Sequence, residues 1–331
     1  MKKLLALFLV YLSTFIATSA QSLSPITDFS VYMPEIRAFN KGLANFPKLD
    51  LSTPEALAAI RNAPAKPVKF VLEPQNRTIA IASGKVRLRI FKPQNPKGIV
   101  IDIHGGGWCI GNPDGSDAVN EQIAKNCHVA VISIDYKLAP ENPIPNQIND
   151  CAEVIRWVLK NGKVEFGTEK IVLQGNSAGA HLAIAAALNV KGEGALDTRI
   201  VGFNLLYGLY DLSKTPSLRQ IKETDLILSK HNLKQFWINS VELLNQNDLQ
   251  NPALSPLYAS LTGLPPVLFS VGTADALIDD TTFMAARWQT AGNKAVLDVY
   301  PECTHLFDTL PTKIAQLARE RMNSWILQCV K

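Results

Sequence analysis

The fold of this chain is decided by residues 171–181, IVLQGNSAGAH, which join three kinds of local structure. A short apolar run rich in β-branched residues stops at Gly-Asn-Ser-Ala-Gly, and an unbroken alanine-rich stretch, 182–188, follows. This order predicts a strand, a sharp turn and a helix, with Ser177 at the turn. Glycines two residues before and after Ser177 remove the Cβ atoms that would clash with the strand and helix. The turn would hold the Ser177 hydroxyl clear of both elements; the alternative is a plain glycine-rich turn.

A second motif lies upstream, where another buried-strand pattern, 98–103, runs into His-Gly-Gly-Gly-Trp at 104–108. Consecutive glycines leave backbone N–H groups unshielded and let the chain approach a ligand closely. Such donors stabilise the oxyanion of an acyl-transfer intermediate, each by about 3–4 kcal/mol. A flexible loop would instead scatter its glycines among Ser and Asn. The placement therefore favours an oxyanion-binding loop.

These two motifs and three further segments resemble the hormone-sensitive-lipase-like branch of the α/β-hydrolases, which includes bacterial esterases and arylacetamide-deacetylase-like enzymes. The further segments are DYKLAPE at 135–141, GTADALIDD at 272–280 and YPECTHLF at 300–307. All five occur in the family's order, and the resemblance covers about residues 85–330. Three positions depart from the family pattern: Asn176 and Ala180 replace an Asp and a Gly, and Leu306 replaces the Gly after the histidine. They alter no catalytic group, but they bear on pocket shape.

Periodicity along the chain predicts an α/β fold with a mainly parallel sheet. Val86, Leu88 and Ile90 alternate with polar residues as in a half-exposed strand. Continuous apolar strands are then expected at 98–103, 129–134, 170–174, 200–206, 267–271 and 295–300. Helices are expected at 145–160, 178–188, 281–291 and 312–328. Strands buried on both faces and separated by crossover helices form parallel sheets, and the resemblance implies the eight-stranded α/β-hydrolase sheet flanked by helices.

Three segments of the chain differ from this alternating pattern. Residues 1–20 combine a basic start, an apolar stretch and small residues before Gln21, as a secretory signal peptide does. Residues 21–75 lack strand alternation and include a helical stretch near 54–61, so they are expected to form an N-terminal cap segment. Residues 76–331 would form the hydrolase domain, interrupted at about 211–258 by a charged, helical cap insertion that includes 232–244.

The signal peptide predicts an exported protein, periplasmic or extracellular. No cysteine follows the apolar stretch to carry a lipid, and no integral membrane anchor is expected after cleavage; an uncleaved anchor is the alternative. The formal charge of +4 falls to +2 without Lys2 and Lys3, and no basic block occurs, so nucleic acid is not an expected partner. Five cysteines are far apart, an odd number that leaves at least one free, and most are expected to be small buried residues.

A serine nucleophile needs a base that takes its proton. In an α/β-hydrolase the acid and then the histidine follow the serine, and only His231 and His305 lie well downstream. His231 falls in the polar insertion, whereas His305 follows the strand expected at 295–300. His181 lies one helical turn beyond the serine and is expected to pack, His104 to orient its own loop, and His128 to be structural.

The acid is expected to be Asp275, which follows the strand at 267–271 by a short loop. Catalytic groups gather at the carboxyl ends of strands in open α/β sheets, and the resemblance places the acid at the same residue. Asp279 and Asp280 precede the helix expected at 281–291 and are expected to cap it. Asp279 remains an alternative acid, and Asp211 a weaker one.

The resemblance further implies that the N–H groups of Gly106, Gly107 and Ala178 hold the oxyanion. The predicted reaction is hydrolysis of small-molecule esters with short to medium acyl chains through an acyl-enzyme on Ser177. It needs no metal or organic cofactor. Two alternatives remain. One is a secreted serine peptidase, which would normally carry a propeller or a larger cap, and about 310 mature residues leave little room for one. The other is a ligand-binding α/β-hydrolase without catalysis, which the presence of Ser177, Asp275 and His305 disfavours.

Overall fold

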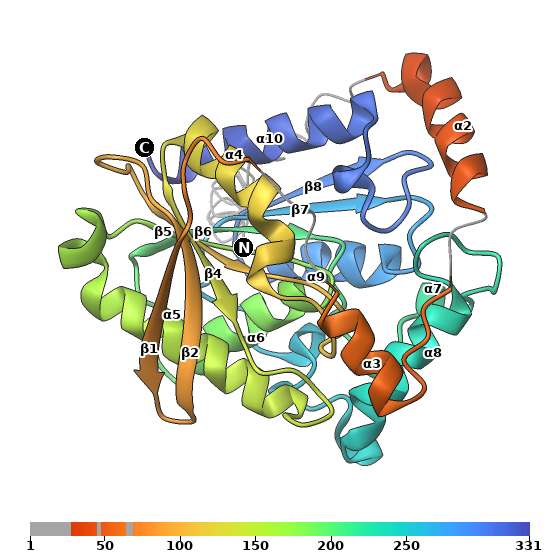
Figure 1. Ribbon diagram of the computed structural model, residues 1–331, viewed down its shortest axis with the longest axis horizontal. Coiled ribbons are helices and arrows are strands. Elements are labelled where there is room, and N and C mark those ends of the chain that lie inside the picture. The colour runs from red at the N-terminus through yellow and green to blue at the C-terminus, as the bar shows by residue number, and fades with distance from the viewer. Residues whose placement is uncertain (1–27, 45–47, 64–68) are drawn as a thin grey trace, which may run out of the picture.

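The computed structural model describes residues 28–44, 48–63 and 69–331 and is built on one eight-stranded sheet (Figure 1). The predicted signal peptide at 1–20 lies outside the described residues. The sheet order is β1-β2-β4-β3-β5-β6-β7-β8; β1, β2 and β4 pair antiparallel, and all other pairs are parallel. The strands are β1 Gln75–Ile81, β2 Gly84–Phe91, β3 Ile99–Ile103, β4 Ala130–Asp135, β5 Ile171–Asn176, β6 Ile200–Leu206, β7 Val267–Gly272 and β8 Ala295–Tyr300. The predicted α/β-hydrolase fold class is confirmed.

The central strands form where the sequence has unbroken apolar runs. Every residue of β3 and β7 is buried, as expected for strands covered on both faces. All six predicted apolar strands agree with the structure to within two residues at each end. β1 was not among the predicted strands, because most of its residues are exposed and polar and it lies at the sheet edge.

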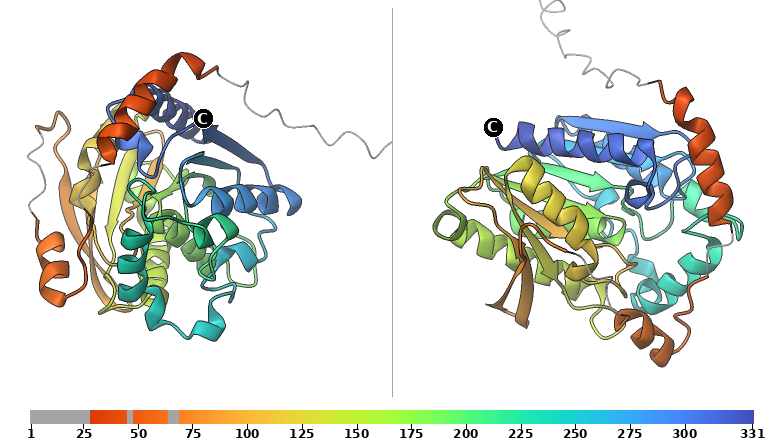
Figure 2. Two further views of the ribbon diagram at one scale, coloured as in Figure 1. Left: turned by 90° about the vertical axis from the view of Figure 1, so that its right-hand side faces the viewer. Right: turned by 45° about the horizontal axis from the view of Figure 1, so that its top comes forward.

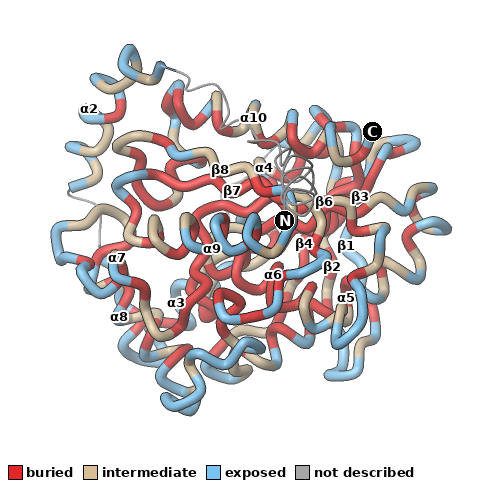
Figure 3. Tube along the Cα trace, turned by 180° about the vertical axis from the view of Figure 1, so that it is seen from behind, coloured by how far each residue is buried: buried red, intermediate tan, exposed pale blue. Residues whose placement is uncertain are grey.

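Helices cover both faces of the sheet (Figures 1 and 2). Helices α5 (Ile144–Phe166), α6 (Ala178–Lys191) and α9 (Ile278–Thr290) pack into the largest apolar cluster on one face. Helices α4 (Asp117–Cys127) and α10 (Lys313–Cys329) pack on the other face. α4 was not predicted, because polar residues outnumber apolar ones in its sequence, DAVNEQIAKNC. Figure 3 shows that the residues of the sheet are mostly buried and that exposed residues lie mainly on the outer turns and loops.

The N-terminal residues and the segment between β6 and β7 lie side by side at the carboxyl end of the sheet (Figure 2). They contain α2 (Met33–Leu43), which was not predicted, α3 (Pro54–Arg61), α7 (Pro216–Arg219) and α8 (Lys230–Asn239). Leu49 N–H donates to Asn232 Oδ1 at 3.0 Å, and Leu51 N–H to Gln235 Oε1 at 3.0 Å. The predicted helix at 232–244 ends early, because Ser240 leaves helical backbone geometry and its hydroxyl bonds to Phe236 O. The cap boundaries at 21–75 and 211–258 stay predictions.

Short 3₁₀ helices connect the larger elements: η1 Ser30–Tyr32, η2 Pro113–Ser116, η3 Val241–Leu243, η4 Gln246–Asp248, η5 Pro256–Tyr258 and η6 Phe307–Thr309. All five cysteines lie in the described part of the chain, and none forms a disulfide. Four are buried and Cys329 is partly exposed. Among the described helices, none has the length and apolar composition to cross a membrane.

Candidate active site

Ser177 lies at the turn between β5 and α6 and has φ 53° and ψ −123°. This backbone conformation is rare for a residue with a side chain and is typical of strained functional positions. The Ser177 N–H donates to Leu206 O of β6 at 3.0 Å, which fixes the turn to the sheet. The serine therefore projects from the carboxyl edge of the central strands.

The two glycines of the turn are required by close packing. A Cβ atom on Gly175 would stand 2.5 Å from the carbonyl carbon of Gly179, and one on Gly179 would overlap the Ile103 carbonyl at the end of β3. Strand β5 and helix α6 can therefore meet at this sharp angle only with hydrogen at both positions. These clashes explain why glycine is found two residues before and two residues after Ser177, as the sequence pattern predicted.

Asp275 and His305 come from the loops after β7 and β8, which are fastened to each other. Ala274 N–H donates to Cys303 O at 3.0 Å, and Thr273 N–H donates to Tyr300 O at 2.9 Å. Both loops therefore stand at the same edge of the sheet as the β5–α6 turn. Sequence-distant side chains meet there because parallel strands end together.

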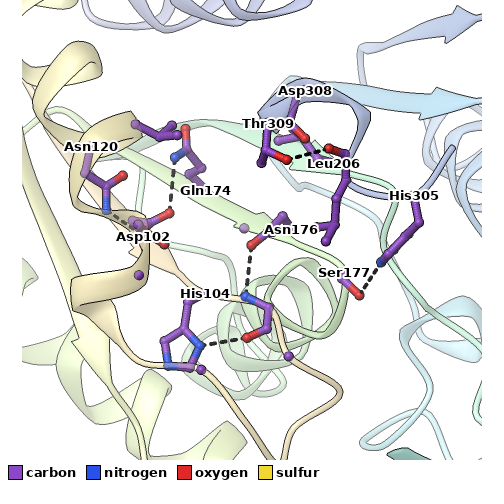
Figure 4. A pocket seen from close by; sticks show the side chains of 18 of the residues that line it. Asp102, His104, Asn120, Gln174, Asn176, Ser177, Leu206, His305, Asp308 and Thr309 are labelled. Atoms are coloured by element: carbon purple, nitrogen blue, oxygen red, sulfur yellow. Dashed lines mark hydrogen bonds between the residues drawn. The ribbon is translucent and has the colours of Figure 1, made fainter. Parts of the chain in front are cut away.

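The three side chains form a hydrogen-bonded relay. Asp275 Oδ2 lies 2.8 Å from His305 Nδ1. On the other side of the ring, His305 Nε2 lies 3.0 Å from Ser177 Oγ (Figure 4). Asp275 Oδ1 also accepts the Leu277 N–H at 2.9 Å, and its side chain is fully buried. The ring of Tyr207 packs edge-on against the His305 ring. This geometry fixes the imidazole so that one nitrogen faces the carboxylate and the other faces the hydroxyl.

The other histidines stand outside the relay. His231 Nε2 bonds to Leu49 O, and His104 Nδ1 bonds to Gly105 O within its own loop. His181 accepts the indole N–H of Trp108 on Nδ1, and its Nε2 lies 2.6 Å from Leu254 O. Burial lowers the pKa of His181 to about 4, so its ring is neutral at pH 7. His128 ends α4 in a left-handed conformation.

The expected capping role of Asp279 and Asp280 is wrong. Helix α9 begins at Ile278, so both residues lie inside its first turn, and neither caps it. Asp279 Oδ2 accepts the Ser217 N–H of α7 at 2.7 Å. Asp280 Oδ1 accepts the backbone N–H groups of Tyr210 and Asp211, and Oδ2 accepts the Thr215 hydroxyl. Both carboxylates fasten the segment after β6 instead. The weaker candidate acid, Asp211, bonds to Ser213 and Tyr258.

The glycine loop after β3 offers unused donors to the same place. Gly106 has φ 122° and Gly107 φ 54°, conformations that glycine adopts without strain. In the described part of the chain, no hydrogen bond engages either N–H. Ala178 opens α6, so its N–H has no partner within the helix. Asn176 Oδ1 accepts the Gly105 N–H at 2.9 Å and so ties the loop to the β5–α6 turn.

A cavity of about 480 Å³ opens beside Ser177. Leu49 and side chains from the segment after β6, among them Ile227, Leu228 and Phe236, line it above the glycine loop. Polar side chains of buried elements line it too: Asp102, Asn120 and Gln174 (Figure 4). None of these three is among the predicted site residues, although an Asp and a Gln inside apolar strand runs are visible in the sequence. Among the described residues, no group of His, Cys, Asp and Glu side chains could hold a metal ion.

Comparison with known proteins agrees with this fold and site. Residues 100–309 match the model of the α/β-hydrolase-fold family. The chain is 30% identical to an esterase of Acinetobacter venetianus over 76% of this chain and 84% of that protein. It is 29% identical to an acetyl esterase of Salmonella schwarzengrund over 70% of this chain and 72% of that protein.

Solved structures give the same result. A hyperthermophilic esterase from Pyrobaculum calidifontis superposes with a TM-score of 0.77 at 25% identity, covering 90% of this chain and 99% of that one. A hormone-sensitive lipase from a metagenome library superposes with a TM-score of 0.73 at 25% identity, covering 89% and 98%. The chain belongs to the α/β-hydrolase family, and within it to the hormone-sensitive-lipase-like esterases.

Proposed function

We propose that the chain is an exported serine carboxylesterase that hydrolyses esters with short to medium acyl chains. The observation that carries the proposal is the relay from Asp275 through His305 to Ser177, with 2.8 Å and 3.0 Å between its polar atoms. Nucleophile, base and orienting acid are the three parts that acyl transfer to a serine requires.

In the proposed mechanism His305 Nε2 takes the proton of Ser177 as Oγ attacks the ester carbonyl. The N–H groups of Gly106, Gly107 and Ala178 bind the oxyanion that develops. Asp275 holds the proton on Nδ1 and stabilises the imidazolium. His305 then gives its proton to the departing alcohol, and water, activated by His305, releases the acid from Ser177.

The expected acyl length is roughly two to eight carbons, because a pocket gains about 0.8 kcal/mol per buried CH₂ only until it is full. A cavity of about 480 Å³, lined in part by cap residues, supports a bounded acyl site. Similarity to proteins named acetyl esterase supports short acyl groups. Activity on a chain-length series of p-nitrophenyl esters should peak within this range. A rate that still rises at sixteen carbons would contradict it.

The nucleophile is tested by Ser177→Ala, which should lower kcat/KM on p-nitrophenyl butyrate by at least about 10³-fold. Circular dichroism and thermal melting should match the native protein, since the hydroxyl makes its only described hydrogen bond to His305. A folded variant that retained most of the activity would remove Ser177 from the mechanism.

Export rests on the signal-peptide pattern of residues 1–20. Intact mass of the protein from its native host should correspond to a chain that begins near Gln21. A soluble cytoplasmic form that begins at Met1 would contradict export without touching the catalytic proposal.

A further inference from the structure

A row of polar side chains crosses the buried sheet beneath the candidate active site. Ser133 of β4 lies opposite Asp102 of β3, Asp102 opposite Gln174 of β5, and Gln174 opposite Asn204 of β6. Residues opposite one another on neighbouring strands share a face, so these four residues form one line, here called the polar row. None is more than 6% exposed. The positions two residues earlier on β3, β4 and β5 are the apolar Val100, Val131 and Val172, so the polar row begins where the apolar packing of this face ends.

Most hydrogen bonds of the polar row are directed toward Asp102; the exception is the one that Asn120 Nδ2 donates to Ser133 Oγ at 3.3 Å. Ser133 Oγ donates to Asp102 Oδ2 at 2.6 Å, and Gln174 Nε2 donates to Oδ1 at 3.1 Å. Asn204 Nδ2 donates to Gln174 Oε1 at 2.8 Å. From helix α4 above the sheet, Asn120 Nδ2 donates to Asp102 Oδ2 at 2.8 Å. An ionised carboxylate is the group that this set of donors fits.

The side-chain oxygens of Asp102 and Asn120 can accept more hydrogen bonds than the protein donates to them. Asp102 has three neutral donors and, in the described part of the chain, no cation within ion-pair distance. Asn120 Oδ1 is buried and has no hydrogen-bond partner. Burying such groups costs free energy unless a donor satisfies them. What is missing at Asp102 and Asn120 is therefore a hydrogen-bond donor, with positive charge favoured.

The same cavity reaches both Ser177 and the polar row. Asp102, Asn120 and Gln174 line it together with Ser177 and His305. In Figure 4, Asp102 and Asn120 stand on the opposite side of Asn176 from His305. His305 must give its proton to the departing alcohol, so the alcohol part of an ester lies against His305. The acyl part then extends away from it, toward Asp102.

We propose that Asp102, Asn120 and Gln174 form the far end of the acyl site and select acyl groups that end in a hydrogen-bond donor, an ammonium or a hydroxyl group. The preferred esters thus carry a polar acyl terminus where simple alkanoates carry a methyl group. This inference rests on the proposed esterase function and on the placement of the acyl group within it.

The first test uses the native protein and matched substrates. p-Nitrophenyl 6-aminohexanoate and 6-hydroxyhexanoate have as many non-hydrogen atoms as p-nitrophenyl heptanoate, and the set is repeated with chains one and two methylenes longer. A donor that reaches the polar row should raise kcat/KM at least about tenfold over the matched alkanoate at one of these lengths. kcat/KM should be higher for the amine than for the alcohol if the charge of Asp102 contributes to recognition. The two values should be equal if only the hydrogen bond contributes. Preference for the alkanoate at every length would overturn the proposal.

Variants then locate the preference. Asp102→Asn should lower the ratio of kcat/KM for the aminohexanoate over the heptanoate about tenfold, because the charge is lost while the shape is kept. Ser133→Ala and Asn204→Leu are matched controls, since both residues belong to the polar row but neither lines the cavity. Their ratios should stay native. A drop in the controls equal to that of Asp102→Asn would show a structural effect and contradict direct recognition. If the variants do not fold, the native substrate series decides alone.

p-Nitrophenyl acetate separates the two proposals, because its acyl group is too short to approach the polar row. Turnover of the acetate without any preference among the longer esters would refute only the acyl selectivity. No turnover of any ester by folded protein would refute the proposed function, and the selectivity with it.

Discussion

The loop after β7 and the first turn of α9 hold acidic side chains that are close in sequence but serve different parts of the molecule. Asp275, in the loop, faces His305 and is held by one backbone N–H. Asp280, in the helix, faces two backbone N–H groups and a hydroxyl of the segment after β6. Both are buried. The comparison shows that a buried carboxylate takes its role from the groups that it meets, because burial and side-chain type are alike in the two.

The largest difference is expected in catalysis. Asp275→Asn should reduce kcat on p-nitrophenyl butyrate by about 10³- to 10⁴-fold, because an amide favours the wrong tautomer of His305. Asp280→Asn should stay within a few-fold of native kcat. Steady-state kinetics of the two purified variants make the comparison, with thermal melting as the control for folding. If Asp280→Asn or Asp279→Asn were the inactive variant instead, the assignment of Asp275 as the catalytic acid would be wrong.

A second difference concerns pH. Burial raises the pKa of the Asp280 carboxyl to about 7 in the folded protein, above its ordinary value of 3.8. The folded state therefore binds this proton more tightly than the unfolded state does. Its contribution to stability is full below about pH 4 and is lost as pH rises toward 7, by at most about 1.4 kcal/mol per pH unit.

Urea unfolding of native protein and Asp280→Asn between pH 4 and 8 measures this contribution. The free energy of unfolding of the native protein, minus that of the variant, should fall as pH rises. Asparagine can keep the acceptor for the two N–H groups and donate to Thr215, so the variant should fold. A difference that stays level with pH, or rises only near pH 4, would mean that Asp280 is ionised in the folded protein throughout this range.

The smallest effect is expected at Asp279, which is half-buried and accepts one N–H at the start of α7. Asp279→Ala should lower the free energy of unfolding by about 1 kcal/mol, the usual cost of losing a side-chain acceptor at a helix start. Chemical denaturation at pH 7 checks the value. Activity on p-nitrophenyl butyrate should remain near native, and a loss as large as that of Asp275→Asn would erase the distinction between loop and helix.

The elements that could be predicted from the sequence are those that depend on a local pattern of residues. The apolar strands, the β5–α6 turn and the loops that hold Asp275 and His305 could all be placed, because apolar runs and glycines act over a few residues. Helix α4 was missed because its sequence is mostly polar, and its apolar contact with the core is limited to Ile123, Ala124 and Cys127, with Val119 packed beside them.

Other features depend on contacts between distant segments. Asp279 and Asp280 satisfy backbone groups of 210–217, which no short sequence window reveals. The alignment of Asp102 with Gln174 depends on the register of β3 against β5. Single polar residues within apolar runs can be seen in the sequence. Their alignment across neighbouring strands cannot, because the register between parallel strands is set by the packing of the whole sheet.

The central claim is that Asp275 and His305 activate Ser177 as a nucleophile, and covalent labelling tests it most directly. A fluorophosphonate probe should add its phosphonyl group to the peptide that contains Ser177, as tandem mass spectrometry of digested native protein would show. Labelling should be lost in Ser177→Ala, slowed about 10³-fold or more in Asp275→Asn, and near native in Asp279→Ala. Rapid labelling of a different residue, or undiminished labelling in Asp275→Asn, would contradict the account.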